Sequence, residues 1–337
     1  MQIDFLSVLF TVFSLVILAV PGYIAIKTKI LNAKGADVLS SLVLYIAQPA
    51  MLFMSFQKTK YDPNIALNLL YVALLTVATH LIMILLVSLI IRKDKDEKKD
   101  KIKKVVKYAS VFGNCGYMGL PFLQMLFSGA GNFQNEILIY GGAVISIFNL
   151  MSWSIGVFMI SGDKKQVSVK KMLLNPNIIA ILLGLILFLF VKTPLVELTS
   201  EGTTLNSILT KLTGSINLIA DMVTPLSMIV IGIKLANVNF KKLFTNLWVY
   251  YSCALKLIAM SLISMLIVSF LPVSTIVKYA VFFTMSMPSA TSAAMFAIKF
   301  DADGEFASIV VLLSTVLSII TIPIMFLVIS NIFGVVI

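Results

Sequence analysis

Two apolar stretches of this chain are long enough to form membrane helices, yet each contains its own helix breakers. The first runs Lys107-Tyr-Ala-Ser-Val-Phe-Gly-Asn-Cys-Gly-Tyr-Met-Gly-Leu-Pro121, and the second runs Lys278-Tyr-Ala-Val-Phe-Phe-Thr-Met-Ser-Met-Pro288-Ser-Ala-Thr. Both open with Lys-Tyr-Ala and carry a phenylalanine at the same offset, Phe112 and Phe283. In lipid a broken helix is stable only where protein or a water-filled cavity pairs the freed backbone groups. The sequence therefore predicts two interrupted helices that are shielded from lipid.

The composition is that of an integral membrane protein. Hydrophobic residues make up 59% of the chain, and the mean hydropathy is +1.02, far above that of soluble proteins. Repeated apolar runs of about 20 residues are each long enough to cross a hydrocarbon core of roughly 30 Å. The first run lacks the charged start and the small-residue cleavage site of a signal peptide, so we expect it to be a span of the mature protein.

The net charge of +11 is concentrated in short loops, above all in Arg92–Lys104, rather than on one folded face. This distribution is the positive-inside pattern of membrane proteins and argues against nucleic-acid binding. Cys115 and Cys253 both lie in apolar runs, so neither a disulfide framework nor a cysteine-based zinc site is indicated.

Ten membrane spans are predicted, at about 5–26, 37–56, 66–91, 105–127, 134–160, 176–191, 206–233, 244–270, 278–298 and 304–333. Lysines gather in alternate connections: Lys27 to Lys34, Arg92 to Lys104, Lys164 to Lys171, Lys234 to Lys242, and Lys299. These connections are predicted to be cytoplasmic, which places both termini, including Ile337, on the outer side.

Corresponding residues in the two halves predict an internal repeat. Gln48-Pro49 in the second span matches Thr224-Pro225 in the seventh, and His80 in the third matches Lys256 in the eighth. Because each half has an odd number of spans, the second half is expected to insert upside down. The predicted fold is all-α, with a first five-helix repeat at 1–160, a cytoplasmic linker at 161–175 and a second five-helix repeat at 176–337.

The first break combines an amide, a thiol, two glycines and a proline, at Asn114, Cys115, Gly116, Gly119 and Pro121. Pro121 removes a backbone donor and frees a carbonyl about one turn earlier, while glycines let the chain unwind. The helix that resumes directs its first amides at the midplane, where they favour an anion, and Asn114 can donate to a carboxylate. The alternative is a kink with small residues for close packing.

The second break contains Pro288, Ser289, Thr291 and Ser292. Its hydroxyl groups can bind a ligand or bond back to carbonyls of their own helix. A matched pair of interrupted spans is typical of a transporter's substrate site. We therefore predict a binding site where the two breaks cross.

His80, Lys256 and Asp221 are ionisable residues predicted at membrane depth, and Gln48 is a further candidate for the pathway. Such residues usually mark a substrate or proton path. His80 is either a titrating group or a neutral packed imidazole, Lys256 either contacts a substrate anion or is a structural counter-charge, and Asp221 either binds a coupling ion or caps the break before Pro225.

No phosphate-binding loop, His-Glu-x-x-His or Gly-x-Ser-x-Gly motif occurs in the sequence. The sequence therefore predicts no ATPase or hydrolase activity, no metal site and no cofactor. An enzyme is disfavoured, because no nucleophile, base and orienting group can be combined.

Several stretches resemble the auxin efflux carrier family, whose bacterial members include malate- and malonate-type permeases. The similar stretches are Tyr45 to Phe53, Gly113 to Pro121 with its Asn-x-Gly-x-x-Gly-x-Pro pattern, Val223 to Gly232, Pro288 to Ala297, and Val310 to Pro323. The resemblance extends over nearly the whole chain, although the span that contains His80 lacks the Asp/Lys pair of plant members.

The resemblance implies two inverted five-helix repeats, like those of bile-acid symporters and sodium/proton antiporters, in which the fourth and ninth helices cross at their breaks. Helices one, two, six and seven would form a scaffold, often dimeric, against which the other six move as an elevator. The substrate site would include Asn114 and the breaks at Pro121 and Pro288.

We therefore expect a multi-pass secondary transporter of small organic anions in a bacterial inner membrane. A sodium-coupled carrier on the same architecture is one alternative, and protons are the other possible coupling ion. A membrane sensor that binds a ligand without moving it is an alternative from another class, disfavoured because no signalling domain is evident in the sequence.

Overall fold

The computed structural model describes residues 3–32, 34–168, 170, 173–236 and 246–332. In these ranges the regular secondary structure is helical, apart from one isolated antiparallel bridge between Gly113 and Ser289. The α-helices are α1 (Phe5–Lys27), α2 (Lys34–Leu42), α3 (Gln48–Gln57), α4 (Pro63–Ile90), α5 (Glu97–Val111), α6 (Leu120–Leu126), α7 (Asn132–Met151), α8 (Val157–Ser161), α10 (Pro176–Ile186), α11 (Thr204–Asp221), α12 (Val223–Ala236), α13 (Leu247–Ala254), α14 (Met260–Ser269), α15 (Thr275–Met285), α16 (Ser292–Lys299) and α17 (Gly304–Ile332).

Short π-helical turns join several of these helices into longer rods. The joining turns are Val43–Ala47, Ser152–Gly156 and Leu255–Ala259, while two further π turns, Cys115–Gly119 and Leu187–Val191, lead into α6 and follow α10. Pro49 and Pro121 each follow a π turn by two residues, where the missing backbone donor changes the hydrogen-bond register. Such turns occur often at functional sites, and one of them, Cys115–Gly119, lies within the first sequence-predicted break.

Eight helices of the described chain are long and apolar enough to cross a membrane: Phe5–Lys27, Gly35–Gln57, Pro63–Ile90, Asn132–Ser161, Pro176–Leu198, Thr204–Ala236, Leu247–Ser269 and Gly304–Val328. The other two predicted spans, 105–127 and 278–298, are divided into short helices, α5 with α6 and α15 with α16. The prediction that these two spans are interrupted is confirmed. The single span predicted at 206–233 corresponds to Thr204–Ala236, in which only Met222 separates α11, ending at Asp221, from α12, beginning at Val223.

Polar caps define where several helices begin. Asp62 accepts a hydrogen bond from Asn64 N before α4, and Asn175 accepts one from Asn177 N before α10. A proline follows each of these caps, at the first helical position where no donor is required.

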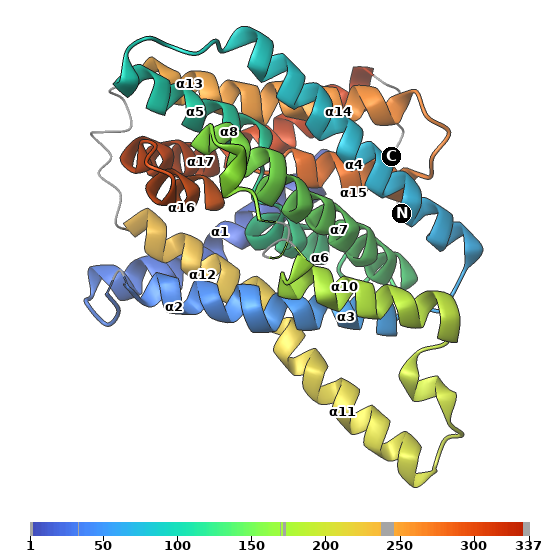
Figure 1. Ribbon diagram of the computed structural model, residues 1–337. Coiled ribbons are helices and arrows are strands. Elements are labelled where there is room, and N and C mark those ends of the chain that lie inside the picture. The colour runs from blue at the N-terminus through green and yellow to red at the C-terminus, as the bar shows by residue number, and fades with distance from the viewer. Residues whose placement is uncertain (1–2, 33, 169, 171–172, 237–245, 333–337) are drawn as a thin grey trace.

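Two close helix pairs make up one side of the molecule. In α1 and α12, Gly22 and Gly232 bring the backbones together, since a methyl group at Gly22 would overlap the carbonyl of Ile229. In α3 and α10, Gly184 lies against the ring of Phe56. Figure 1 shows α2, α3 and α12 along one side of the body and α4, α13 and α14 along the other, with α6 and α7 between them.

The basic connections lie together at one end of the helices. Lys101 pairs with Asp301 at 2.9 Å, and Lys104 Nζ approaches the backbone at Gly162. The hydrogen bond to Asp301 raises the pKa of Lys101. Lys171, Lys241, Lys242 and Ile337, which belong to the predicted topology, lie outside the described residues.

The weakly charged connections meet at the opposite end. Lys60 pairs with Glu197 at 3.0 Å, and Tyr61 N donates to the carbonyl of Lys192 at 3.2 Å. The basic and the weakly charged connections that these contacts join therefore lie at opposite ends of the helices in the described structure.

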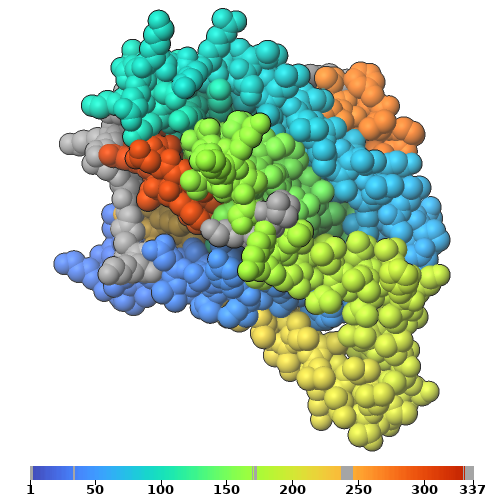
Figure 2. Space-filling view, in the orientation of Figure 1, coloured from blue at the N-terminus to red at the C-terminus, as the bar shows by residue number. Residues whose placement is uncertain are grey.

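Helix α11 projects from the rest of the molecule, as Figure 2 shows. Its exposed side chains include Leu205, Ile208, Leu212 and Leu218. An apolar projecting helix in a protein of this composition is covered by lipid or by another protein.

Candidate functional site

The two breaks meet at the centre of the molecule as a pair of extended, antiparallel segments. Asn114 N donates to the carbonyl of Pro288 at 2.7 Å, and Ala290 N donates to the carbonyl of Phe112 at 2.9 Å. Each break therefore satisfies backbone groups of the other, as a membrane interior requires. The crossing expected from the sequence is present.

The first break lies before the proline rather than at it. Helix α5 ends at Val111, Phe112 has extended backbone angles, and the π turn starts at Cys115. Pro121 is the second residue of α6, so it marks the resumed helix and not the interruption. The sequence-based placement of the first break at Pro121 is corrected to 112–114, because the helical stretch that begins at Cys115 continues through Pro121, whose missing donor falls just after the π turn.

A side chain at Gly113 would displace the end of the Lys256 side chain at the crossing. A methyl group at Gly113 would lie 2.8 Å from Lys256 Nζ and 3.4 Å from the carbonyl oxygen of Met287. The lysine amine is thus held directly against the first break.

Lys256 is fully buried, and its amine donates to the carbonyl of Met285 at 3.0 Å. Met285 is the last residue of α15, and Gly113 follows the end of α5, so the amine lies beside the C-terminal ends of two half-helices. The partial negative charge of helix C-termini stabilises a cation there. The sequence suggested two roles for Lys256, contact with a substrate anion or a structural counter-charge. This geometry supports the structural counter-charge.

Asn114 is 4% exposed, and its side-chain Nδ2 has no hydrogen-bond partner within the described chain. The backbone carbonyl of Asn114 accepts from Met118 N and Gly119 N, both at 3.1 Å, and so starts the helical stretch that continues through α6. The side chain remains available to a ligand, because an unpaired buried donor is costly.

Gln48 reaches this point from α3. Its Oε1 accepts from Asn177 Nδ2 at 3.1 Å, while its own Nε2 is buried and without a partner in the described structure. A methyl group at Gly116 would lie 2.7 Å from that Nε2. The structure thus brings Gln48, Asn114 and Gly116 together; Oδ1 of Asn177 also lacks a partner.

The hydroxyl groups of the second break are mostly engaged within the protein. Ser289 Oγ donates to the carbonyl of Ala109 at 2.9 Å, and Ser289 N donates to Ser314 Oγ at 3.1 Å. Ser292 Oγ lies 2.8 Å from the hydroxyl of Tyr108, whereas Thr291 is partly exposed at the start of α16.

His80 and Asp221 occupy different settings. His80 is fully buried near the crossing, where Nδ1 bonds the carbonyl of Thr76 at 2.8 Å and the ring centroid lies 5.6 Å from that of Phe112. Its Nε2 has no partner in the described residues. Asp221 is exposed at the end of α11, accepts a hydrogen bond from Asn217, and is not brought to the crossing.

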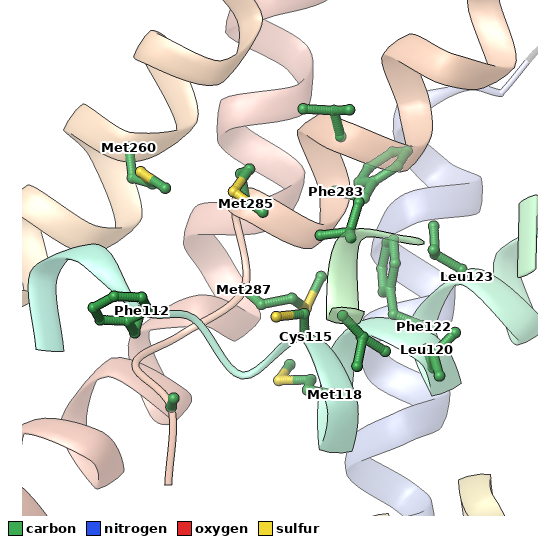
Figure 3. Packing of buried hydrophobic residues seen from close by; sticks show 14 of the residues in the cluster. Phe112, Cys115, Met118, Leu120, Phe122, Leu123, Met260, Phe283, Met285 and Met287 are labelled. Atoms are coloured by element: carbon green, nitrogen blue, oxygen red, sulfur yellow. The ribbon is translucent and has the colours of Figure 1, made fainter. Parts of the chain in front are cut away.

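Apolar side chains enclose the crossing on several sides. Figure 3 shows Phe112, Cys115, Met285 and Met287 around the extended segments, with Met118 beside them. The thiol of Cys115 donates to the carbonyl of Gly113 at 3.3 Å. The site is therefore a small polar centre in an apolar shell, where hydrogen bonds are strong.

Acidic groups are scarce in the interior. Among the described residues Asp100 is the only buried carboxylate, and it pairs with Lys104 at the basic end. No group of three or more His, Cys, Asp or Glu that could hold a metal ion occurs in the described chain. Amide donors and an amine without carboxylates suit an anion better than a cation.

Sequence reasoning missed Asn177, Tyr108 and Ser314. Asn177 had a usable signal, because Asn175-Pro176-Asn177 opens an apolar span and a second asparagine is not needed for the cap. Tyr108 and Ser314 had none, since their contacts join residues 184 and 25 positions apart.

Comparison with known proteins agrees with this geometry. A family model described as membrane transport protein matches residues 7–326. An uncharacterized transporter of Methanocaldococcus jannaschii is 25% identical over 308 residues, which cover 91% of this chain and 94% of that relative. The match is to transport proteins rather than to enzymes, and it confirms the sequence resemblance to auxin efflux carriers. The chain belongs to the membrane transport protein family and is a multi-pass membrane protein of that family.

Proposed function

We propose that the protein is a secondary transporter of small organic anions, with carboxylates as the substrate class. The observation that carries this proposal is the buried, unpaired amide of Asn114 at the crossing of the two breaks. A carboxylate accepts hydrogen bonds from such a donor, and carboxylates of the protein itself are scarce in the described interior.

The packing supports an inverted repeat and elevator movement. Helix α1 packs on α12, and α10 packs on α3, so the first span of each proposed repeat contacts the second span of the other. These four helices form the proposed scaffold. Two of them belong to the proposed repeat 1–160 and two to the proposed repeat 176–337, and the linker 161–175 joins the repeats. The crossing lies on the helices proposed to move, and Gln48 reaches it from the scaffold.

The position of Lys256 bears on the coupling ion. Interrupted helices of transporters commonly hold a coupling cation at their carbonyl ends, and here an amine already donates to the carbonyl of Met285. Transport without sodium is therefore the favoured form of the proposal, and protons or no coupling ion remain to be separated by experiment.

The proposed setting is a bacterial inner membrane with the basic end of the helices in the cytoplasm. Cysteine accessibility should label positions within 92–104 from the cytoplasmic side and the C-terminus from outside. The exposed apolar face of α11 supports a homodimer through the scaffold.

Uptake into proteoliposomes tests the proposal. Purified protein would be reconstituted and supplied with radiolabelled acetate, malonate, succinate and L-malate under imposed pH or sodium gradients. We expect uptake of at least one carboxylate above that of protein-free vesicles, and loss of most of it in Asn114→Ala. Binding of these anions without uptake would support the sensor instead, and neither binding nor uptake would overturn the substrate class.

A further inference from the structure

The amide of Gln48 is held in one orientation. Asn177 Nδ2 donates to Gln48 Oε1 at 3.1 Å, and a primary amide has its acceptor and donor on opposite sides. When Asn177 fixes the oxygen, the nitrogen is directed away from α10. The direction it takes is toward Gly116, where the absence of a side chain leaves room.

Two unpaired amide donors therefore lie in or beside the segment of the first break. Gln48 Nε2 adjoins Gly116, and Asn114 Nδ2 belongs to a residue two positions earlier. Gln48 is 1% exposed, Asn114 4% and Asn177 3%, so all three side chains are shielded from bulk solvent. Unpaired buried donors on two different helical elements indicate an acceptor ligand.

We propose that Asn177 is a positioning residue which orients Gln48, so that Gln48 Nε2 and Asn114 Nδ2 together bind one carboxylate group of the substrate. The inference rests on the proposed function and deepens it, because it names the chemical group that is recognised and a residue outside the breaks that controls recognition. Charge-assisted hydrogen bonds to a carboxylate are stronger than those between neutral groups.

The arrangement also connects binding to movement. Gln48 and Asn177 lie on α3 and α10, which pack together, whereas Asn114 starts the helical stretch that leads into α6. A carboxylate bridging both amides contacts two bodies at once. Displacement of one body against the other separates the donors and releases the anion.

A purely structural role is the competing explanation, since the Gln48–Asn177 hydrogen bond also joins α3 to α10. Asn177→Asp separates the two explanations. A carboxylate at this position only accepts, so Gln48 must turn its nitrogen toward α10 and its oxygen toward Gly116. Asn177→Ala removes the orienting bond without enforcing the reversed amide.

The experiment measures KM and maximal rate in proteoliposomes, with the one carboxylate among acetate, malonate, succinate and L-malate that wild type takes up fastest. We expect KM to rise about threefold in Asn177→Ala and about tenfold or more in Asn177→Asp, the value for one lost bond to a charged group. Melting temperatures in detergent show whether each variant is folded.

A second background isolates orientation from charge. In Gln48→Met the amide is gone, so Asn177→Asp should then change KM by less than about twofold. The same large rise in both backgrounds, or unchanged KM in Asn177→Asp alone, would overturn the positioning role. If wild type takes up none of the four anions, the proposed function fails first; if wild type transports and the variants match it, only this inference fails.

Discussion

The two breaks pair through the same backbone pattern but differ in chemistry. In the first, the side chain of Asn114 is buried and unpaired, and the amide of Gln48 approaches Gly116. In the second, the hydroxyl of Ser289 bonds a carbonyl of α5, and Ser292 bonds Tyr108. The first break thus retains donors for a ligand, while the second uses its polar groups to hold the crossing together.

Two breaks with matching sequence features therefore differ in which polar groups they leave unpaired. Backbone pairing at a crossing is a requirement of the membrane interior and applies to both segments. Ligand recognition needs donors left over after that requirement is met. By this measure the first break is the proposed ligand-binding side, and the second break stabilises the crossing.

The largest effect is expected for Lys256→Met, which tests whether the crossing depends on a buried charge. The substitution leaves the carbonyl of Met285 unpaired and removes the cation from two helix ends. We expect these changes to lower the free energy of unfolding by about 3 kcal/mol. We expect a clearly lower melting temperature in detergent, measured against Lys211→Met on the exposed face of α11. Equal melting temperatures in the two variants would contradict the counter-charge role.

Asn114→Ala tests the ligand side of the comparison. One lost hydrogen bond to a charged group corresponds to a roughly tenfold to hundredfold loss of affinity for the transported carboxylate. Stability should change little, since the side chain has no partner to lose within the described chain. Titration of carboxylate binding would show this, with the exposed Asn132→Ala as control; wild-type affinity in Asn114→Ala would exclude the residue from the site.

Ser289→Ala should show the opposite pattern. The variant loses the bond to the carbonyl of Ala109, a cost of about 1 kcal/mol in stability, while KM for the carboxylate stays near wild type. Thermal melting and uptake measured on the same preparation would test this. A tenfold rise of KM (on the order expected for a lost ligand contact) would assign the second break to the binding site.

The smallest effect is expected for His80→Gln. Because Nδ1 bonds the carbonyl of Thr76 and the ring packs near Phe112, we expect the packing role rather than titration. Uptake should change by less than about twofold, and its pH profile between about pH 5 and 8 should match wild type. A flattened profile in His80→Gln would instead make His80 the pH-sensitive group of the transport path.

Much of the architecture was readable from local sequence. Hydropathy and loop charge predicted the membrane helices and the two ends at which the connections gather, because a bilayer core excludes charge and unpaired backbone over fixed lengths. Proline and glycine marked both interruptions, although the first break lies at 112–114 and not at Pro121, because the π turn lets the helix continue through the proline.

The sequence by itself determined that this is a helical membrane protein with two interrupted spans, since hydrophobic run length and helix breakers act locally. Tertiary structure alone decided which polar groups remain unpaired. Whether the side chain of Ser289 or of Gln48 has a spare donor depends on partners such as Ala109 and Asn177, which lie 180 and 129 positions away. Hydrogen-bond satisfaction in an apolar interior is settled only when those distant groups meet, and at this crossing the groups left over define the candidate site.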